Sequence, residues 1–194
     1  MTRNSKSIFS NIGASNHSKY EREANDYYST DETAIQLLHK HNLLDRDVPY
    51  WETAVGGGRL AIELKRLGYN VTKETDLFDR GYGDSGVDFF KCKEVFQGNT
   101  ITNPPYKHIN DWIVHSLEIT SNKVYIFYRI QTIETLKRYQ IFKKYPPLYI
   151  CPFVRRIQCY RNDDTNIRGS AVCYSWFIWD NTVDNKDTKV IWLI

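Results

Sequence analysis

Strand-like and helix-like segments alternate along this chain of 194 residues, and that alternation restricts its possible folds more than any other feature. We expect strands at residues 49–55, 71–77, 99–102, 123–130, 148–154, 171–179 and 189–194, and helices at about 29–43, 60–67, 109–117 and 135–144. Strands separated by helices predict an α/β fold, a mostly parallel sheet with helices on both faces. The last strands follow one another without a helix, which indicates an antiparallel strand near the C-terminus.

Two local patterns add detail to this outline. Residues Ser29, Thr30, Asp31 and Glu32 have the pattern of a capping box, which predicts that the first helix begins there. Residues 78–98 contain several glycines and no clear periodicity, so we expect a long loop.

The composition is that of one packed domain. Hydrophobic residues make up 41% of the chain, which supports a single core at this length. No apolar run approaches the roughly 20 residues of a membrane-spanning helix, and residues 1–7 lack the apolar core of a signal peptide. We therefore predict a cytoplasmic protein with a flexible tail over residues 1–24 and one domain over residues 25–194.

The cysteines and histidines do not predict a metal site. Cys92, Cys151, Cys159 and Cys173 contain no C-x-x-C pair, and the five histidines are scattered along the chain. We expect no bound metal and interpret the cysteines as reduced core thiols of an intracellular protein.

The net charge of +3 is unevenly distributed. Residues 123–168 contain ten Lys and Arg against three acidic residues, whereas residues 1–122 contain 14 basic and 17 acidic residues. A basic half beside a mildly acidic half suggests contact with a polyanion on one face. An ordinary solvated surface of Lys and Arg explains the same numbers equally well.

A rigid polar corner follows the third expected strand, where the sequence reads Asn103, Pro104, Pro105 and Tyr106. Each proline fixes its own φ near about −65° and removes a backbone donor, so the segment exposes carbonyl oxygens. A planar amino group could donate to the Asn103 side-chain oxygen and the Pro104 carbonyl while its ring stacks on Tyr106. A simple proline turn between a strand and a helix is the alternative.

Three further segments follow expected strands, at the edge of a parallel sheet where ligands bind. The turn at residues 56–58, Gly-Gly-Gly, lets a backbone approach a ligand closely. Asp76 could accept hydrogen bonds from two ribose hydroxyls, with Glu74 as the competing acid. Asp88 and Phe89 could bind an adenine amino group and cover its ring. The alternative is a tight turn for residues 56–58, a helix cap for Asp76, and a surface carboxylate beside a core aromatic for Asp88 and Phe89. The order of these three segments and the corner at 103–106 along the chain nevertheless indicates an adenosine cofactor beside an amino-group receptor.

In these motifs the chain resembles S-adenosylmethionine-dependent amino-methyltransferases of the DNA adenine-N6 type, above all the small phage and bacterial forms. The likeness runs from about residue 26 to residue 179. The corner at 103–106 matches the family's catalytic motif, and residues 52–58, Glu-Thr-Ala-Val-Gly-Gly-Gly, match its cofactor motif. Residues 28–30, Tyr-Ser-Thr, match the segment that holds the methionine end of the cofactor.

The resemblance implies a Rossmann-like class I methyltransferase sheet, S-adenosylmethionine as the cofactor and DNA as the partner. The catalytic residues that it implies are Asn103, Pro104, Pro105 and Tyr106, and the cofactor-binding residues are Tyr28, Thr30, Glu52, Ala54, Gly56, Gly58, Asp76, Asp88 and Phe89. The sequence departs from the family pattern at Thr53, where proline is usual, at Val55, where a smaller residue is usual, and at Gly57. The chain after residue 130 is too short for a target-recognition domain, so we expect none.

A base within a duplex cannot reach such a pocket, so it must be flipped out or supplied by a single strand. We predict that Phe153 forms a second wall for this base, and that Arg155, Arg156, Tyr160 and Arg161 contribute further wall and phosphate contacts. A strand with basic ends that face solvent is the alternative.

Other substrates and other roles remain compatible with the sequence. Methylation of a glutamine amide in a protein uses the same motif but needs no basic face, and RNA adenine is not separable from DNA adenine. Cytosine N4 is disfavoured, because such enzymes more often have Ser or Asp in place of Asn103. A degenerate relative that binds nucleic acid or a partner without turnover is the non-enzymatic alternative, and the oligomeric state is not indicated.

Overall fold

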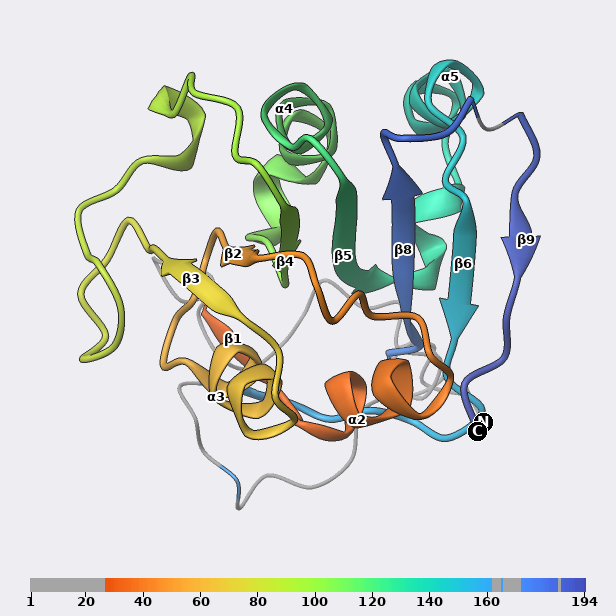
Figure 1. Ribbon diagram of the computed structural model, residues 1–194. Helices are drawn as coiled ribbons and strands as arrows, with labels where there is room; N and C mark the ends of the chain where they lie inside the picture. Colours follow the sequence, from red (N-terminus) through yellow and green to blue (C-terminus); the bar gives the residue numbers. More distant parts are fainter. Residues whose placement is uncertain (1–26, 162–164, 166–171, 185) are drawn as a thin grey trace, which may run out of the picture.

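The computed structural model describes residues 27–161, 165, 172–184 and 186–194 (Figure 1). The prediction of a tail over residues 1–24 lies outside the described residues. In the described part, no helix is both long enough and apolar enough to cross a membrane.

A seven-stranded sheet with the order β3-β2-β4-β5-β8-β6-β9 forms the centre of the molecule. The strands are β2 Tyr50–Glu52, β3 Val71–Glu74, β4 Asn99–Thr102, β5 Lys123–Arg129, β6 Tyr149–Pro152, β8 Tyr174–Asp180 and β9 Lys189–Val190. Strands β3, β2, β4 and β5 are mutually parallel, whereas β8 runs antiparallel to both of its neighbours, β5 and β6. The predicted α/β sheet, mostly parallel with an antiparallel strand near the C-terminus, is confirmed.

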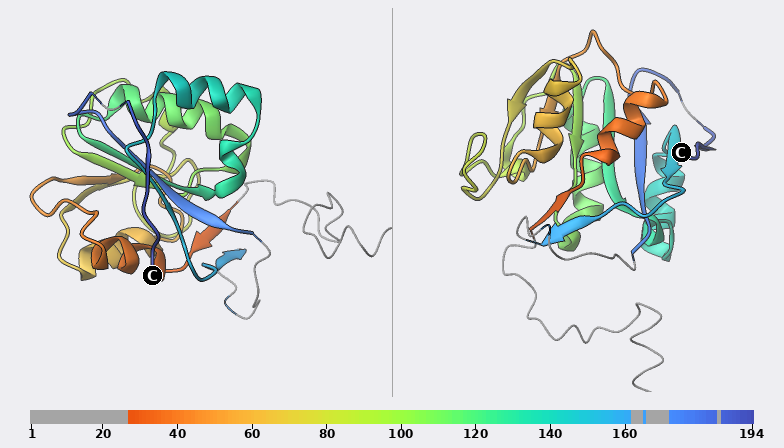
Figure 2. Two further views of the ribbon diagram at one scale, coloured as in Figure 1. Left: turned by 90° about the vertical axis from the view of Figure 1, so that its right-hand side faces the viewer. Right: turned by 90° about the horizontal axis from the view of Figure 1, so that it is seen from below.

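Helices cover both faces of this sheet, as predicted (Figures 1 and 2). Helices α2 Thr33–Lys40 and α3 Arg59–Arg66 lie on one face, and α4 Ile109–Ile119 and α5 Leu136–Lys144 lie on the other. Short 3-10 helices are η1 Phe89–Lys91, η2 Tyr106–His108 and η3 Ile130–Ile133.

Strand β5 shows why two helical layers are needed. Its side chains alternate between the faces: Tyr125 and Phe127 belong to the core under α2 and α3, and Val124, Ile126 and Tyr128 belong to the core under α4. All five are at most 4% exposed. A strand buried on both sides requires cover on both sides, which α/β connections supply.

A second, two-stranded ribbon was not predicted. Strand β1 Tyr28–Thr30 pairs antiparallel with β7 Cys159–Arg161. The predicted capping box is therefore wrong, because Ser29 and Thr30 lie in a strand; the backbone N–H of Thr33 donates instead to the Asp31 carboxylate, at 2.9 Å. The helix still begins close to the predicted position, at Thr33, with Glu32 as its N-cap residue and no side-chain capping bond from Glu32.

Several predicted helices and strands were too long. Strand β3 ends at Glu74, so Asp76 lies two residues beyond it, and α2 ends at Lys40 rather than at residue 43. Cys151 is buried as predicted, whereas Cys173 is exposed and is not a core thiol. The positions after the strands nevertheless share one edge of the sheet, and that edge carries the candidate site.

Candidate active site

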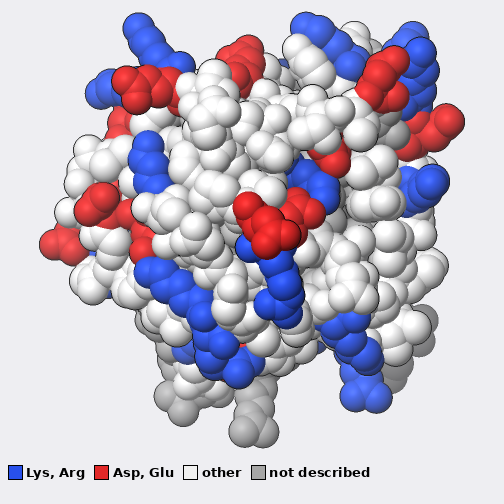
Figure 3. All heavy atoms as spheres, viewed as in Figure 1, with Lys and Arg blue, Asp and Glu red and all other residues white. Residues whose placement is uncertain are grey.

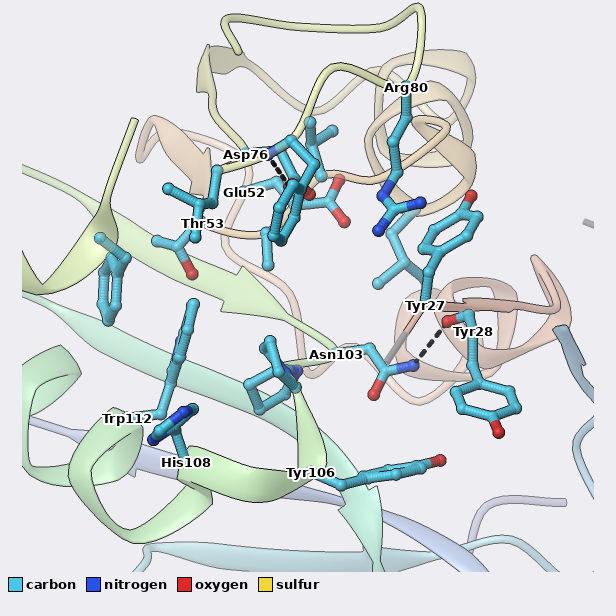
Figure 4. A pocket seen from close by; sticks show the side chains of 18 of the residues that line it. Tyr27, Tyr28, Glu52, Thr53, Asp76, Arg80, Asn103, Tyr106, His108 and Trp112 are labelled. Atoms are coloured by element: carbon cyan, nitrogen blue, oxygen red, sulfur yellow. Dashed lines mark hydrogen bonds between the residues drawn. The ribbon is translucent and has the colours of Figure 1, made fainter. Parts of the chain in front are cut away.

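A cavity of about 570 Å³ opens at the carboxyl ends of β2 and β4 (Figure 4). Of the predicted site residues, those that line it are Tyr28, Thr30, Glu52, Ala54, Asp76, Asp88, Phe89, Asn103, Pro104, Pro105 and Tyr106. The segments that carry them are far apart in the sequence, so the fold brings the predicted catalytic and cofactor motifs to a single cavity. Gly57 lines it as well, whereas Gly56 and Gly58 are not among the described lining residues.

The carboxamide of Asn103 is held in one orientation. Its Nδ2 donates to the Tyr28 carbonyl oxygen at 3.1 Å and to Thr30 Oγ1 at 2.9 Å. Figure 4 shows the side-chain oxygen turned away from these partners, toward Tyr106 and the cavity. Among the described residues, none donates a hydrogen bond to that oxygen. An acceptor therefore faces the cavity.

Tyr106 is fixed at both its ring and its backbone. Its hydroxyl lies 2.7 Å from the hydroxyl of Tyr174 in β8, and its carbonyl accepts a hydrogen bond from the Tyr128 hydroxyl at 3.0 Å. The Arg129 guanidinium lies over its ring, 4.2 Å from the centroid. Burial raises the pKa of the Tyr106 hydroxyl, so this residue stays neutral and presents an aromatic surface.

The glycine turn is shaped by neighbouring tyrosines. Gly56 has φ +56° and Gly58 has φ +88°, and a Cβ at either position would clash with the ring of Tyr27 or of Tyr82, respectively. The Gly57 N–H donates to the Tyr27 hydroxyl at 2.9 Å. Only glycine combines these dihedrals with such close approaches.

Asp76, rather than Glu74, is the acid at the cavity. Its Oδ2 accepts from the Gly56 N–H and its Oδ1 from the Phe78 N–H, both at 2.9 Å. Glu74 instead pairs with Lys65 at 2.5 Å and accepts from the Tyr82 hydroxyl at 2.7 Å, outside the lining. Asp76 thus joins the end of β3 to the glycine turn after β2 and retains lone pairs that can face a ligand.

Glu52 is a second carboxyl beside the cavity, and it is 2% exposed. Burial raises its pKa well above the ordinary value of 4.5, and the nearby Glu74 and Asp76 carboxylates add to the rise. A hydrogen bond with the backbone of Ala61 and the positive charge of Lys65 lower the pKa, but by less. Its Oε2 has no hydrogen-bond partner within the described residues. A carboxyl in this setting favours its neutral form.

Two aromatic residues follow Asp88, one of them buried and the other partly exposed. Phe89 is 2% exposed and stacks on Trp112, with centroids 4.4 Å apart. Phe90 is 39% exposed and also lines the cavity. Asp88 is engaged in its own turn, where it accepts from the Phe90 N–H at 3.1 Å and pairs with Lys91.

Sequence reasoning missed several residues of the cavity wall. They are Tyr27, Leu77, Phe78, Arg80, Phe90, His108 and Trp112. Tyr27, Leu77 and Phe90 directly adjoin a predicted residue, so proximity in sequence could have indicated these three. Arg80 carried no such signal: it reaches the cavity because its guanidinium lies over the ring of Tyr27, 4.0 Å from the centroid.

The five predicted nucleic-acid contacts lie away from the cavity lining. Phe153 packs against the core, with its ring centroid 5.8 Å from that of Phe127. Arg155 and Arg156 are exposed between β6 and β7. The Tyr160 hydroxyl donates to Asp31 at 2.6 Å, and Arg161 pairs through its backbone with Tyr28. The structure therefore places the two arginines at the surface and the remaining three in or beside the scaffold of the site.

Side chains of both charges occur over most of the face seen in Figure 3, with two local groupings. Acidic side chains gather at its left edge, over the loop after β3, and Lys and Arg side chains lie along its lower part. In Figure 1 the lower part of this view is occupied by helices α2 and α3. Within the described residues, no group of His, Cys, Asp and Glu is arranged to hold a metal.

No protein-family model and no curated protein sequence matches the chain. A methyltransferase subunit of a type I restriction-modification system from Streptococcus thermophilus superposes with a TM-score of 0.63 at 11% identity, over 88% of this chain and 48% of that one. A proposed RNA methyltransferase from Pyrococcus horikoshii superposes with a TM-score of 0.59 at 12% identity, over 91% of this chain and 98% of that one. Magnesium protoporphyrin IX methyltransferase from Synechocystis, solved with bound SAM, superposes with a TM-score of 0.50 at 11% identity, over 77% of this chain and 76% of that one.

The chain thus spans about half the length of the restriction-modification subunit and nearly all of the Pyrococcus protein. The superpositions cover the seven-stranded sheet, with its antiparallel strand β8, and the helices on both faces, since they include 77% to 91% of this chain. The chain has the Rossmann-like fold of class I methyltransferases.

Proposed function

We propose that this protein is an S-adenosylmethionine-dependent methyltransferase that modifies the exocyclic N6 amino group of adenine in DNA. The observation that carries the proposal is the orientation of Asn103, whose side-chain oxygen faces the cavity because its amide nitrogen is bound to Tyr28 and Thr30. An acceptor in this position suits a substrate that donates hydrogen bonds through an amino group.

The other end of the cavity fits the cofactor. Asp76 offers carboxylate oxygens to ribose hydroxyls, and Leu77, Phe78 and Phe90 expose 52%, 40% and 39% of their surface for an adenine ring. Thr53 Oγ1, like Glu52 Oε2, is buried beside the cavity without a hydrogen-bond partner among the described residues. Unsatisfied polar atoms are rare in native proteins, and a polar ligand is one explanation for them.

The reaction follows from what the residues at 103–106 can do. When bound, S-adenosylmethionine supplies an electrophilic methyl group on its sulfonium. Asn103 Oδ1 and the Pro104 carbonyl accept the two amino hydrogens, which favours a tetrahedral nitrogen and exposes its lone pair. Tyr106 stacks on the ring and holds the nitrogen in line, so positioning and electrostatics supply the catalysis. The surplus proton leaves to solvent after transfer.

A nucleic-acid substrate is supported by charge and by the fold. Lys and Arg side chains lie along the lower part of the face in Figure 3, and the neighbour from Streptococcus thermophilus is a methyltransferase subunit of a restriction-modification system. A target base must leave its stack to reach Asn103. RNA adenine is the second candidate, since the proposed RNA methyltransferase matches this chain over nearly its whole length.

Incubation with methyl-labelled S-adenosylmethionine and unmethylated DNA, RNA or a cell extract tests the proposal. We expect label in N6-methyladenine from DNA. Label in RNA or in protein glutamine would reassign the substrate, and no label together with no cofactor binding by calorimetry would refute an enzymatic role.

The Asn103→Ala variant is the control for the site. It is expected to lower kcat by about 100-fold or more, the range for loss of a transition-state hydrogen bond, while cofactor affinity stays unchanged. Equal loss of both would remove Asn103 from the substrate end of the cavity.

A further inference from the structure

Thr30 makes its closest polar contact with the catalytic motif. Its Oγ1 lies 2.9 Å from Asn103 Nδ2, and the residue is only 2% exposed. The family resemblance assigns Thr30 to the methionine end of the cofactor. From this contact we propose instead that Thr30 is a positioning residue, which holds the Asn103 carboxamide with its oxygen toward the substrate. This inference rests on the proposed function.

A carboxamide has two orientations that differ by a half turn and have opposite hydrogen-bonding character. One presents an oxygen that accepts, and the other presents an NH₂ that only donates. An NH₂ facing a substrate amino group would set donor against donor. The groups that bind the Asn103 amide nitrogen therefore decide whether its oxygen or its NH₂ group faces the substrate.

The Tyr28 carbonyl can only accept, but the Thr30 hydroxyl can accept or donate, so its own hydrogen has to be directed elsewhere. Thr30 pairs with Cys159 across the β1–β7 ribbon. Burial raises the pKa of the Cys159 thiol to about 12, and hydrogen bonds from Tyr174 and Thr30 act against that rise. Because Asn103 Nδ2 can only donate, the Thr30 hydroxyl accepts in this contact.

The contacts form a continuous chain across the site. Asn103 donates to Thr30, and Thr30 pairs with Cys159 across the ribbon. Tyr174 offsets in part the effect of burial on the pKa of the Cys159 thiol, and the Tyr174 hydroxyl lies 2.7 Å from that of Tyr106. The ribbon therefore connects the acceptor and the aromatic ring of the catalytic motif. Its strands are too short to contribute much to the core, which fits a role in orienting the site.

The two roles for Thr30 predict opposite outcomes for Thr30→Val, which preserves shape but removes the hydroxyl. As a positioning residue, Thr30→Val lowers kcat by about 10-fold, since one hydrogen bond is lost and a buried donor is left unpaired. Its cofactor Kd stays within twofold of wild type. Thr30→Ser keeps the hydroxyl and restores kcat to within threefold.

Thr100→Val is the matched control, because it removes a buried hydroxyl bond, to Thr120 at 2.9 Å, from the same strand that leads to Asn103. It is expected to lower the melting temperature without changing kcat. Unchanged kcat in Thr30→Val, a weakened cofactor Kd, or failure of Thr30→Ser to restore kcat would each overturn the positioning role.

A readout without turnover separates this inference from the proposed function. In protein labelled with ¹⁵N-asparagine, the Asn103 side-chain NH₂ resonance, assigned by its loss in Asn103→Asp, should exchange slowly with solvent. Thr30→Val should accelerate that exchange and Thr30→Ser should preserve it. Rapid exchange in the wild type refutes the inference even if methyl transfer is observed. Slow exchange that depends on Thr30, with no transfer to any substrate, would refute only the function.

Discussion

The hydroxyls of Tyr106 and Tyr174 lie 2.7 Å apart, which ties the aromatic residue after β4 to the antiparallel strand β8. These strands are separated by β5 in the sheet. Because burial raises the pKa of both phenols, the pair stays neutral and bonded across the physiological pH range. The position of the Tyr106 ring therefore depends on a strand that is distant in the sequence, since the two tyrosines are 68 residues apart.

The Tyr174→Phe variant removes this bond and keeps the ring. We expect the substrate KM to rise about threefold to 10-fold, and the free energy of unfolding to fall by about 1 kcal/mol, as for an ordinary buried hydrogen bond. Steady-state kinetics and urea unfolding measure the two. Tyr139→Phe, at an exposed tyrosine of α5, is the matched control. An unchanged KM would show that Tyr106 keeps its place without Tyr174.

The Asp76→Ala variant tests the carboxylate at the proposed cofactor end of the cavity. We expect cofactor Kd to increase at least about 10-fold, and stability to fall by about 1–3 kcal/mol, because the N–H groups of Gly56 and Phe78 lose their acceptor. Calorimetry and thermal melting give these values. Glu74→Ala breaks a pair with Lys65 outside the cavity and should leave Kd unchanged. The reverse pattern would move the ribose contact to Glu74.

Glu52 should make stability depend on pH. Burial raises its pKa in the folded protein well above 4.5, so below pH 4.5 both folded and unfolded chains carry the neutral acid. As pH rises past 4.5 the unfolded chain ionises first, and wild type loses stability until the folded pKa is passed. Glu52→Gln should therefore be the more stable protein at pH 7 and lose that advantage near pH 4. Chemical unfolding at both pH values measures the difference, and parallel curves would contradict it.

The exposed arginines between β6 and β7 test the nucleic-acid surface. Replacing Arg155 and Arg156 with Ala should weaken DNA binding and reduce the slope of log K against log salt by up to about 2, since each phosphate contact contributes about 0.9. Lys186→Ala with Lys189→Ala removes the same charge near the start of β9, beside the opposite end of β6, and should leave the slope unchanged. Equal slopes in all three proteins would place the DNA elsewhere.

Local patterns in the sequence were sufficient for much of the fold. Strand β4 was predicted residue for residue, because Asn99–Thr102 contains three β-branched residues in succession and is followed, after Asn103, by two prolines. Helix α5 was placed to within one residue of Leu136–Lys144, since the prolines after it stop the helix. Such signals act over a few residues, so the sequence carries them in full. The same holds for the order of glycine turn, Asp76 and Asn103, which parallel strands bring to one edge.

The tertiary structure alone decided how those residues are used. Thr30 and Cys159 meet across a ribbon whose strands are about 130 residues apart, and no local pattern encodes that pairing. Phe89 and Phe90 both line the cavity, but the stacking of Phe89 on Trp112 and the greater exposure of Phe90 follow only from the fold. The sequence determined which polar groups stand at the edge of the sheet. Which atom of Asn103 faces the cavity depends on hydrogen bonds to Tyr28 and Thr30, and those partners come together only when the chain has folded.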